Sequence, residues 1–534
     1  MEWHFRSRRM LRDNETVGSH PEFISRKRLF KFLFDRYNLV GKINICKEII
    51  LPYSKAKVKI VMNDAKSCLQ MLLADPRITD EDYLFFDDDP TAPPPHDLDY
   101  IGDINTGVAY LETYKKLIKV PGKQVLLPVI FYIDGSATGQ FANLPVTPVK
   151  FTLGIFNRKA REKPHMWKTL GYLPVIEKSR SSGRRLLMNS LHNDVTAALA
   201  DMDDDEGNKV STKLTPSQDL HAMLEVIWEE FVKVQDTGFV WDLMYKGKEY
   251  EGIEFQLFTP FIKCDTEEAD RLAGSFPSRT GVSQLCRYCC CPTDECDEPR
   301  AKYPRKTVPM IDKLIKRNDE SRLTELSQQN IINACYKLRF GAHNDEGVHC
   351  ACPLEMLHAL LLGIFKYVRD CFYNQVGATS ALAEEINALA NAYGHLYAHQ
   401  SDRDMPKTKF SNGIQGGKLM AKEFSGILLL IATILRSTKG QKLLLAKKSS
   451  TFAKDDKLAT WSVLVETLLM WEMWLKSDTM TKKHVHRSKK YHLYIMWLIR
   501  DVANRQEGMG MKIMKYHAIM HMTQDIVHFG VPMN

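Results

Sequence analysis

The chain has 534 residues, of which 44% are hydrophobic and 26% are charged, a composition that excludes wholesale disorder. Its formal net charge of +8 is compatible with a polyanionic partner, although many basic proteins have none. A domain usually holds roughly 100–200 residues, so we expect three or four units. The most apolar segment, residues 426–435, is about half as long as a bilayer-spanning helix, so no membrane span is expected.

The N-terminus is charged and lacks an apolar signal core, so we expect an intracellular protein. The 12 cysteines would then lie in a reducing compartment, where clustered cysteines bind metal more often than they form disulfides. Residues 1–75 are mixed and basic, with helical patches at 28–37 and 64–73. Residues 76–100 are acidic and rich in proline, and this composition predicts a linker.

An α/β pattern follows the predicted linker. A helical pattern at 106–118 precedes the apolar run 125–133, which is typical of a strand buried on both faces and ends at Asp134 and Gly135. The pattern continues with strands at 149–156 and 171–176, a loop at 201–208, an amphipathic helix at 218–234, a strand at 250–262 and a helix at 266–273.

Asp134 and Asp265 each follow a predicted buried strand. Carboxylates at neighbouring strand ends suit two-metal phosphoryl transfer, because they can hold two Mg²⁺ ions about 3.5–4 Å apart. Gly135 would let a ligand approach the backbone closely. Two structural explanations stay open, since Asp-Gly is a common turn and an aspartate after a strand often caps the next helix.

Cys286 and Cys289 form a CxxC, the spacing with which two thiolates grip one Zn²⁺ ion. The best second half of such a site is His517 and His521, which at i and i+4 would share one helix face. Rival ligands remain, namely Cys290, Cys291, Cys296, Cys350 and Cys352. Unliganded thiols beside a solvated histidine pair are the alternative.

Residues 311–498 have an almost wholly helical pattern, rich in leucine and tryptophan. Within it, Glu355 and His358 would lie at i and i+3 of a helix and could share a hydrogen bond. Either a polar pair inside a helical block or a role in handling DNA would account for them.

Taken in order, these motifs resemble those of CACTA-type (EnSpm) and Plavaka-like DNA transposases. The resemblance covers about residues 125–534 and is carried by short stretches, which are Asp134-Gly135, Asp265, Leu285-Cys286-Arg287-Tyr288-Cys289, residues 353–367, His517 and His521, and residues 525–534. The resemblance implies an α/β ribonuclease-H-like core, interrupted by a large all-α insertion and carrying a zinc knuckle. It also implies Mg²⁺ or Mn²⁺ at Asp134 and Asp265, and Zn²⁺ at Cys286, Cys289, His517 and His521.

The implied domain order begins with a mixed N-terminal region and linker at 1–100 and a catalytic core at 101–280. A zinc knuckle at 281–310, a helical insertion at 311–510 and a return helix at 511–534 follow. In the family, a third acidic residue follows the sequence motif to which residues 529–534 correspond. Neither Glu355 nor Asp525 stands at that place, so we expect the sequence as given to lack that acid, and to bind DNA but cut it poorly.

The implied activity is cutting and joining of transposon ends in the nucleus, with double-stranded DNA as partner and a homo-oligomer assembled on it. Basic segments at 158–163 and 178–185 are candidates for phosphate contacts. Two alternatives stay open. One is a catalytically inactive, transposase-derived module that binds DNA or protein, and the other is an unrelated intracellular helical protein stabilised by zinc.

Overall fold

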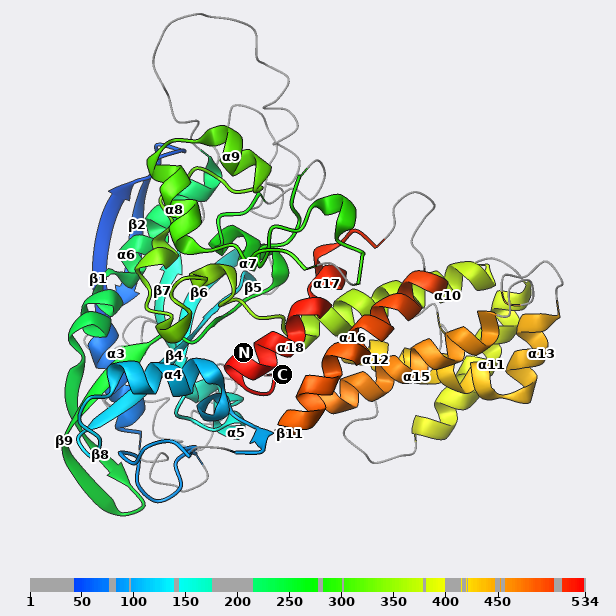
Figure 1. The fold of residues 1–534 in the computed structure, drawn as a ribbon, viewed down its shortest axis with the longest axis horizontal. Helices are drawn as coiled ribbons and strands as arrows, with labels where there is room; N and C mark the ends of the chain where they lie inside the picture. The colour runs from blue at the N-terminus through cyan, green and yellow to red at the C-terminus, as the bar shows by residue number, and fades with distance from the viewer. Residues whose placement is uncertain are drawn as a thin grey trace, which may run out of the picture.

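The computed structural model describes residues 43–75, 83–95, 98–138, 144–174, 215–276, 282–299, 302–377, 381–398, 414, 419, 421–446, 452, 457–503 and 511–532. A mixed sheet with its covering helices forms one part of the molecule, and a block of long helices extends away from it (Figure 1). The helix predicted at 28–37, the loop at 201–208 and the basic segment at 178–185 lie outside the described residues.

Nine strands of the described chain form the main sheet, in the order β1-β2-β7-β6-β4-β9-β8, with β5 paired to β6 and β10 paired to β4. Neighbours are antiparallel except where β4 runs parallel to β9 and β10. The strands are β1 (Ile43–Ile50), β2 (Lys57–Asn63), β4 (Gln124–Ile133), β5 (Ser136–Thr138), β6 (Leu144–Leu153), β7 (Lys168–Leu173), β8 (Phe239–Tyr245), β9 (Lys248–Phe258) and β10 (Ile262–Lys263). A separate two-stranded ladder joins β3 (Tyr100–Ile101) to β11 (Met480–Thr481).

Strand β4 lies inside the sheet, as its apolar run predicts. Its first half pairs with β9 and its second half with β6. Pro128, which has no N–H to donate, stands where the partner changes, and its carbonyl accepts from Gly154 N at 2.7 Å. The predicted strand at 250–262 is two strands in the structure, β9 and β10, and both are parallel neighbours of β4.

Helices cover both faces of this sheet. Alternate β4 residues such as Phe131 pack with α3 (Ala65–Leu73) and α6 (Pro216–Thr237) in one core cluster. Leu126 and Ile130 point the other way and pack with α4 (Val108–Leu117), where Phe529 of the C-terminal helix joins them. The short helices around the sheet and its loops are η4 (Ile104–Thr106), α5 (Arg158–Arg161), η5 (Pro164–Met166), α7 (Thr266–Leu272), η7 (Thr293–Glu295), η8 (Ala334–Lys337), η9 (Gly341–His343) and η10 (Gly347–His349).

The described part of the N-terminal region contributes two strands to the main sheet. Strands β1 and β2 extend it through β7. The segment predicted as a linker packs on it as well, because Leu84 is buried and the Tyr245 hydroxyl donates to Phe86 O at 2.6 Å.

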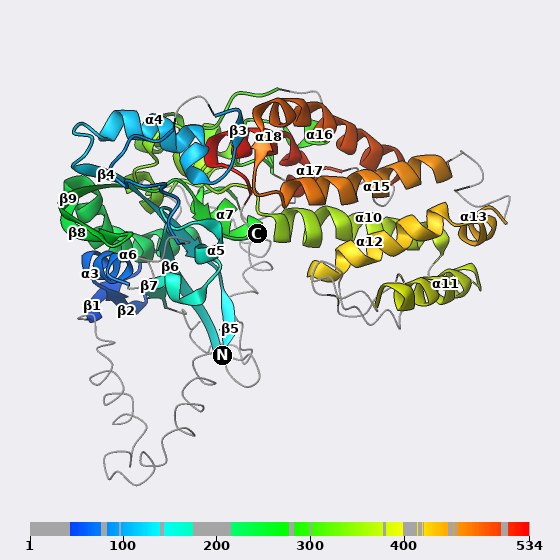
Figure 2. The same ribbon diagram turned by 90° about the horizontal axis from the view of Figure 1, so that it is seen from below.

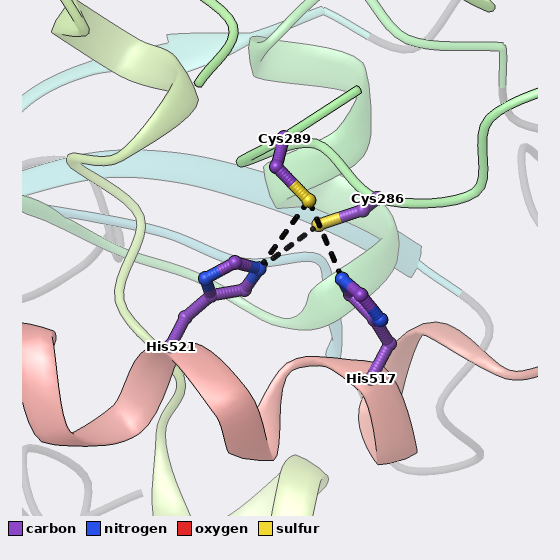
Figure 3. Close-up of side chains that lie close together, drawn as sticks. All are labelled: Cys286, Cys289, His517 and His521. Carbon is purple, nitrogen blue, oxygen red and sulfur yellow. Dashed lines mark hydrogen bonds between the residues drawn. The ribbon is translucent and has the colours of Figure 1, made fainter. Parts of the chain in front are cut away.

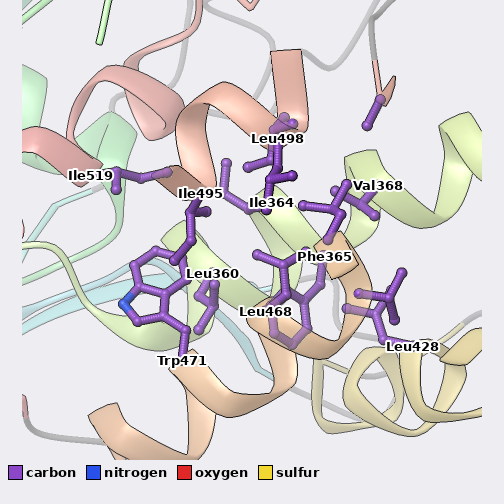
Figure 4. Packing of buried hydrophobic residues seen from close by; sticks show 14 of the residues in the cluster. Leu360, Ile364, Phe365, Val368, Leu428, Leu468, Trp471, Ile495, Leu498 and Ile519 are labelled. Carbon is purple, nitrogen blue, oxygen red and sulfur yellow. The ribbon is translucent and has the colours of Figure 1, made fainter. Parts of the chain in front are cut away.

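The helical block is made mainly of long helices whose leucines and tryptophans meet in one core (Figure 4). Trp461 and Trp471 are buried there, as expected of core residues. The expectation of helix throughout 311–498 is wrong between α9 and η11, where turns and 3₁₀ segments run instead. The helices are α8 (Val308–Lys316), α9 (Glu320–Glu325), the π-helix η11 (Met356–Phe365), α10 (Lys366–Val376), α11 (Ala381–Ala398), α12 (Ala421–Arg436), α13 (Thr438–Leu445), α15 (Lys457–Leu475) and α16 (Lys482–Val502).

Two further helices, α17 (Met514–His517) and α18 (Ile519–Phe529), lie between the sheet part and the helical block (Figure 2). Helix α18 packs against both α16 and α4. The contact with α4 is close, since a Cβ added to Gly107 would lie 2.4 Å from His528 O. In the part of the chain that is described, no helix combines the length and the apolar character needed to cross a membrane.

Candidate functional site

Cys286, Cys289, His517 and His521 converge in a buried cluster, here called the Cys/His cluster (Figure 3). The two cysteines come from the loop before η7, while His517 ends α17 and His521 lies in the first turn of α18. The sulfur-to-nitrogen distances are 3.4 Å for Cys286 Sγ to His521 Nε2, 3.4 Å for Cys289 Sγ to His517 Nε2 and 3.7 Å for Cys289 Sγ to His521 Nε2.

These distances fit one tetrahedral ion. Zn–S bonds of about 2.3 Å and Zn–N bonds of about 2.0 Å at tetrahedral angles hold ligand atoms about 3.5 Å apart. All four donor atoms lie within 4.8 Å of one another. The cluster could therefore bind a metal such as zinc, with two thiolates and two imidazoles as ligands.

Neighbouring groups orient the two imidazoles. His517 Nδ1 lies 3.0 Å from Cys296 O, so the ring donates there and leaves Nε2 as the ligand atom. His521 stacks on Tyr288 with ring centroids 4.7 Å apart. Its Nδ1 faces a guanidinium nitrogen of Arg305 at 3.1 Å, and ligation through Nε2 would leave Nδ1 protonated, so this contact must loosen when a metal binds.

The electrostatics of the cluster favour one thiolate even without an ion. Burial would raise the pKa of Cys286, but the Cys289 thiol and the imidazoles of His521 and His517 bring that pKa well below its usual value. The pKa of Cys289 is raised by the Cys286 sulfur and by burial, because two adjacent thiols do not readily ionise together. A divalent cation would relieve this repulsion.

The rival cysteines take other places. Cys291 and Cys296 form a second buried group of three donors with His517, so they lie beside the cluster. Cys290, Cys350 and Cys352 belong to neither group among the described residues.

The two predicted acids, here called the acid pair (Asp134 and Asp265), follow neighbouring parallel strands. Lys263 of β10 is the register partner of Tyr132 of β4, and each aspartate stands two residues further along the chain, just past the end of its strand. The two acids therefore follow the same end of two paired strands, and the charges of both act on Tyr132 and on Glu268.

Each aspartate also has a local hydrogen bond. The Tyr132 hydroxyl donates to Asp134 Oδ2 at 2.7 Å. Asp265 caps α7, because its Oδ1 accepts from Glu268 N at 2.7 Å. The helix-capping explanation for Asp265 is therefore confirmed. A metal ion would have to bind the other oxygen of this carboxylate, Oδ2.

Two further carboxylates approach the acid pair. Burial raises the pKa of Glu268 to about 7, Arg271 opposes this, and the charges of Asp265 and Asp134 add to it. Glu355 caps the π-helix η11 by accepting from His358 N at 2.8 Å, and it also contacts His358 Nδ1. Its charge contributes to the raised pKa of Tyr132, whose main cause is burial.

No three of these carboxylates form a compact group. Among the described residues, the sets of three or more donors within 4.8 Å of one another are the two Cys/His groups. These acids therefore do not converge on one small ion in this structure. Mutual repulsion among carboxylates of this kind is relieved by divalent cations with oxygen ligands.

Asp525 lies elsewhere, buried where Tyr288 OH and Leu354 N approach its Oδ2 at 3.2 and 3.4 Å. Burial raises its pKa to about 7. Sequence reasoning missed Glu268, although an acid three residues after a capping aspartate is a recognisable helix-start pattern.

No protein-family model matches the chain, and a comparison with the curated proteins finds no match.

Proposed function

We propose that the chain is a DNA transposase of the CACTA/Plavaka type, with a ribonuclease-H-like core and a helical insertion at residues 311–510. The observation that carries this proposal is the register of β10 on β4, which takes Asp134 and Asp265 to the same sheet edge. The resemblance of the sequence motifs supplies the reaction, since acids so placed would suit two-metal phosphoryl transfer.

In this proposal the acid pair holds Mg²⁺ or Mn²⁺, which supplies the activation of water and the stabilisation of the leaving oxygen. Asp134 is held by Tyr132 and Asp265 by the start of α7, so both carboxylates are kept in place before any ion binds. Glu355 is the third carboxylate that we assign to this site. It enters from the helical block, and its charge acts on Lys263 and Tyr132.

The Cys/His cluster serves as a structural zinc site in the same proposal. Its ligands come from the loop after the sheet part and from α17–α18, so zinc would fix the end of the helical block beside the acid pair. Double-stranded DNA, as transposon ends and as target, is the proposed partner. A homo-oligomer on DNA and a nuclear location follow from the same resemblance.

A catalytically inactive, transposase-derived module that binds DNA or protein is the second candidate. It is favoured by one observation, the N-cap of α7, which accounts for Asp265 without any metal ion. The two candidates share the zinc site and differ in whether the acid pair binds divalent cations and cuts DNA.

The test measures Mn²⁺ binding by isothermal titration and Mn²⁺-dependent nicking of supercoiled plasmid by the whole chain. The transposase proposal expects Mn²⁺ binding together with slow nicking, which Asp134→Asn should abolish. Asp88→Asn is the matched control, because the Asp88 side chain is 96% exposed and lies outside the acid pair. Mn²⁺ binding without nicking would favour the inactive module. Failure to bind Mn²⁺ would remove the acid pair as a metal site.

A further inference from the structure

A cavity of about 350 Å³ opens on the face of the sheet that carries the acid pair. Its floor is a row of three side chains from adjacent strands, Lys150, Tyr132 and Lys263. Tyr132 is the register partner of Lys150 on β6 and of Lys263 on β10. The wall opposite is formed by residues of α5 and η5 and by Trp167, and we call this cavity the basic pocket.

The pocket adjoins the acid pair directly. Asp134 and Asp265 stand two residues beyond Tyr132 and Lys263, which is one step of about 7 Å along the strands. Tyr132 takes part in both places, since its ring lines the pocket and its hydroxyl donates to Asp134 Oδ2 at 2.7 Å. A ligand in the pocket would therefore lie against the same edge as a ligand of the acid pair.

Positive charge dominates the lining. The cationic side chains are Lys150, Arg158, Arg161 and Lys263, against the single carboxylate of Glu162. Arg161 is buried and fixed, because it donates to Gly154 O at 3.2 Å and pairs with Asp103 at 2.5 Å.

Arg158 is the most adaptable of these cations. Its ion pair with Asp478 is 3.4 Å long, and Asp478 is 90% exposed, so the pair contributes little and can be exchanged. Lys150 lies across the floor from it and comes from a strand, so its backbone is rigid. Both cations line the same pocket and could contact one anion bound in it.

An aromatic surface completes the pocket. Trp167 and Tyr132 lie edge to face with centroids 6.0 Å apart. Trp167 Nε1 donates to Arg161 O at 2.7 Å, which fixes the indole in the wall. A fixed flat ring beside a cluster of cations suits a phosphate group that carries a planar base.

We propose that the basic pocket binds one nucleotide of a single-stranded nucleic-acid segment, with its phosphate between Lys150 and Arg158 and its base against Trp167. This inference rests on the proposed function, because it places the nucleotide next to the phosphate that the acid pair would act on. It adds a binding subsite made of residues that take no part in holding metal ions.

The first test measures binding of a fluorescein-labelled (dT)₆ by anisotropy, with no divalent cation added, so that cutting plays no part. Lys150→Gln and Arg158→Gln should each weaken binding about 10-fold and lower the salt dependence by about one phosphate contact. Lys159→Gln is the matched control, because Lys159 is an exposed lysine of α5 that does not line the pocket. Equal effects of Lys150→Gln and Lys159→Gln would overturn the pocket and leave only diffuse attraction.

A second arm separates a strand from a free anion. Trp167→Leu should weaken binding of (dT)₆ about 10-fold and leave an abasic hexamer unaffected, since stacking needs the base. Competition by inorganic phosphate should be lost in Lys150→Gln. If Lys150→Gln abolishes phosphate competition but leaves (dT)₆ affinity unchanged, the pocket takes a small anion and the proposed strand site is wrong.

These outcomes are distinct from failure of the proposed function. Loss of (dT)₆ binding in the pocket variants, with Lys159→Gln binding normally, supports the pocket even if the chain never nicks DNA. Thermal unfolding of each variant shows that the fold is kept, and Trp167→Phe, which retains an aromatic face, should recover most of the (dT)₆ affinity.

Discussion

Cys289 Sγ lies 3.4 Å from His517 Nε2, although 228 residues separate them in the chain. This contact closes a loop that contains the whole helical block, and the second pair, Cys286 and His521, closes it again at 3.4 Å. A metal ion here would hold α17 and α18 against the loop after the sheet part, where α18 also reaches α4. Such an ion would therefore tie the end of the helical block to the sheet part.

We expect purified protein to hold one zinc ion per chain, and Cys286→Ser to lose it. The free energy of unfolding should fall by several kcal/mol, because a structural zinc site contributes its binding free energy to folding. Elemental analysis and denaturant unfolding measure the two effects. Cys290→Ser is the matched control, since Cys290 is adjacent in sequence but outside both donor groups. Equal zinc content in Cys286→Ser and the wild type would contradict the assignment.

The helix cap formed by Asp265 and its proposed metal-binding role can be separated by substitution. Asp265→Asn should keep the stability of the chain, because asparagine caps a helix as well as aspartate does, but it should lose Mn²⁺ binding. Asp265→Ala should lose Mn²⁺ binding, and its free energy of unfolding should also fall by about 1 kcal/mol because alanine does not cap a helix. Asp319 also caps a helix, α9, and lies away from the acid pair, so Asp319→Asn should change neither property. Undiminished Mn²⁺ affinity in Asp265→Asn would leave Asp265 as a cap alone.

Much of the fold could be predicted from periodicity. The run 125–133 became β4, and the helical patterns at 64–73, 218–234 and 266–273 became α3, α6 and α7. Strands β1 and β2 were missed because their apolar residues alternate with exposed ones and do not form an apolar run, although Ile60 and Met62 of β2 are buried. The segment between α9 and η11 was overestimated as helix, because its buried residues pack with the sheet core, which periodicity does not reveal.

Some residues of the candidate site could likewise be predicted from the sequence, and others could not. A strand followed by aspartate is a local pattern, and so is CxxC, so both could be identified in the sequence. The position of Glu355 could not, because it depends on how the loop before η11 returns to the sheet edge. The Cys291 and Cys296 thiols also lie close to His517. Nothing in the sequence favoured these two cysteines over the other rival ligands.

We expect Glu355→Gln to weaken Mn²⁺ binding about 10-fold if Glu355 is the third carboxylate of the site. The same change should lower the pKa of His358, because the hydrogen bond that the His358 ring donates to the Glu355 carboxylate raises that pKa in the wild type. Titration calorimetry reports the first effect and histidine NMR the second. A lowered His358 pKa with unaltered Mn²⁺ affinity would confine Glu355 to capping η11. Glu346→Gln serves as the control, because Glu346 likewise lies three residues from a histidine that it contacts, His343.

Two glycines should respond differently to alanine. At Gly107 a Cβ would lie 2.4 Å from His528 O and 3.0 Å from Gly530 N, so Gly107→Ala must push α4 and α18 apart. We expect a loss of about 1–3 kcal/mol in unfolding free energy. At Gly135 the nearest atom would be Thr147 Oγ1 at 3.7 Å, so Gly135→Ala should be neutral for stability. A neutral Gly107→Ala would show that this contact is loose.

The last prediction concerns Asp525 and pH. Burial raises its pKa from 3.8 to about 7, and Arg305 and its hydrogen bonds from Leu354 N and Tyr288 only partly oppose this. In the unfolded chain the carboxyl ionises near its usual pKa of about 3.9, so the unfolded state loses this proton at lower pH than the folded state does. The contribution of Asp525 to stability is therefore fully present below about pH 4 and is lost as the pH rises to about 7.

Asp525→Asn should remove this dependence, since the amide oxygen can still accept from Leu354 N and Tyr288 but carries no charge. Each unit of pKa difference corresponds to about 1.4 kcal/mol, so at pH 8 the variant should be several kcal/mol more stable than the wild type. At pH 4 the two proteins should unfold at nearly the same denaturant concentration. Urea unfolding at both pH values tests this. A variant that is less stable than the wild type at pH 8 would mean that the Asp525 carboxylate is stabilised by its neighbours, Arg305 above all.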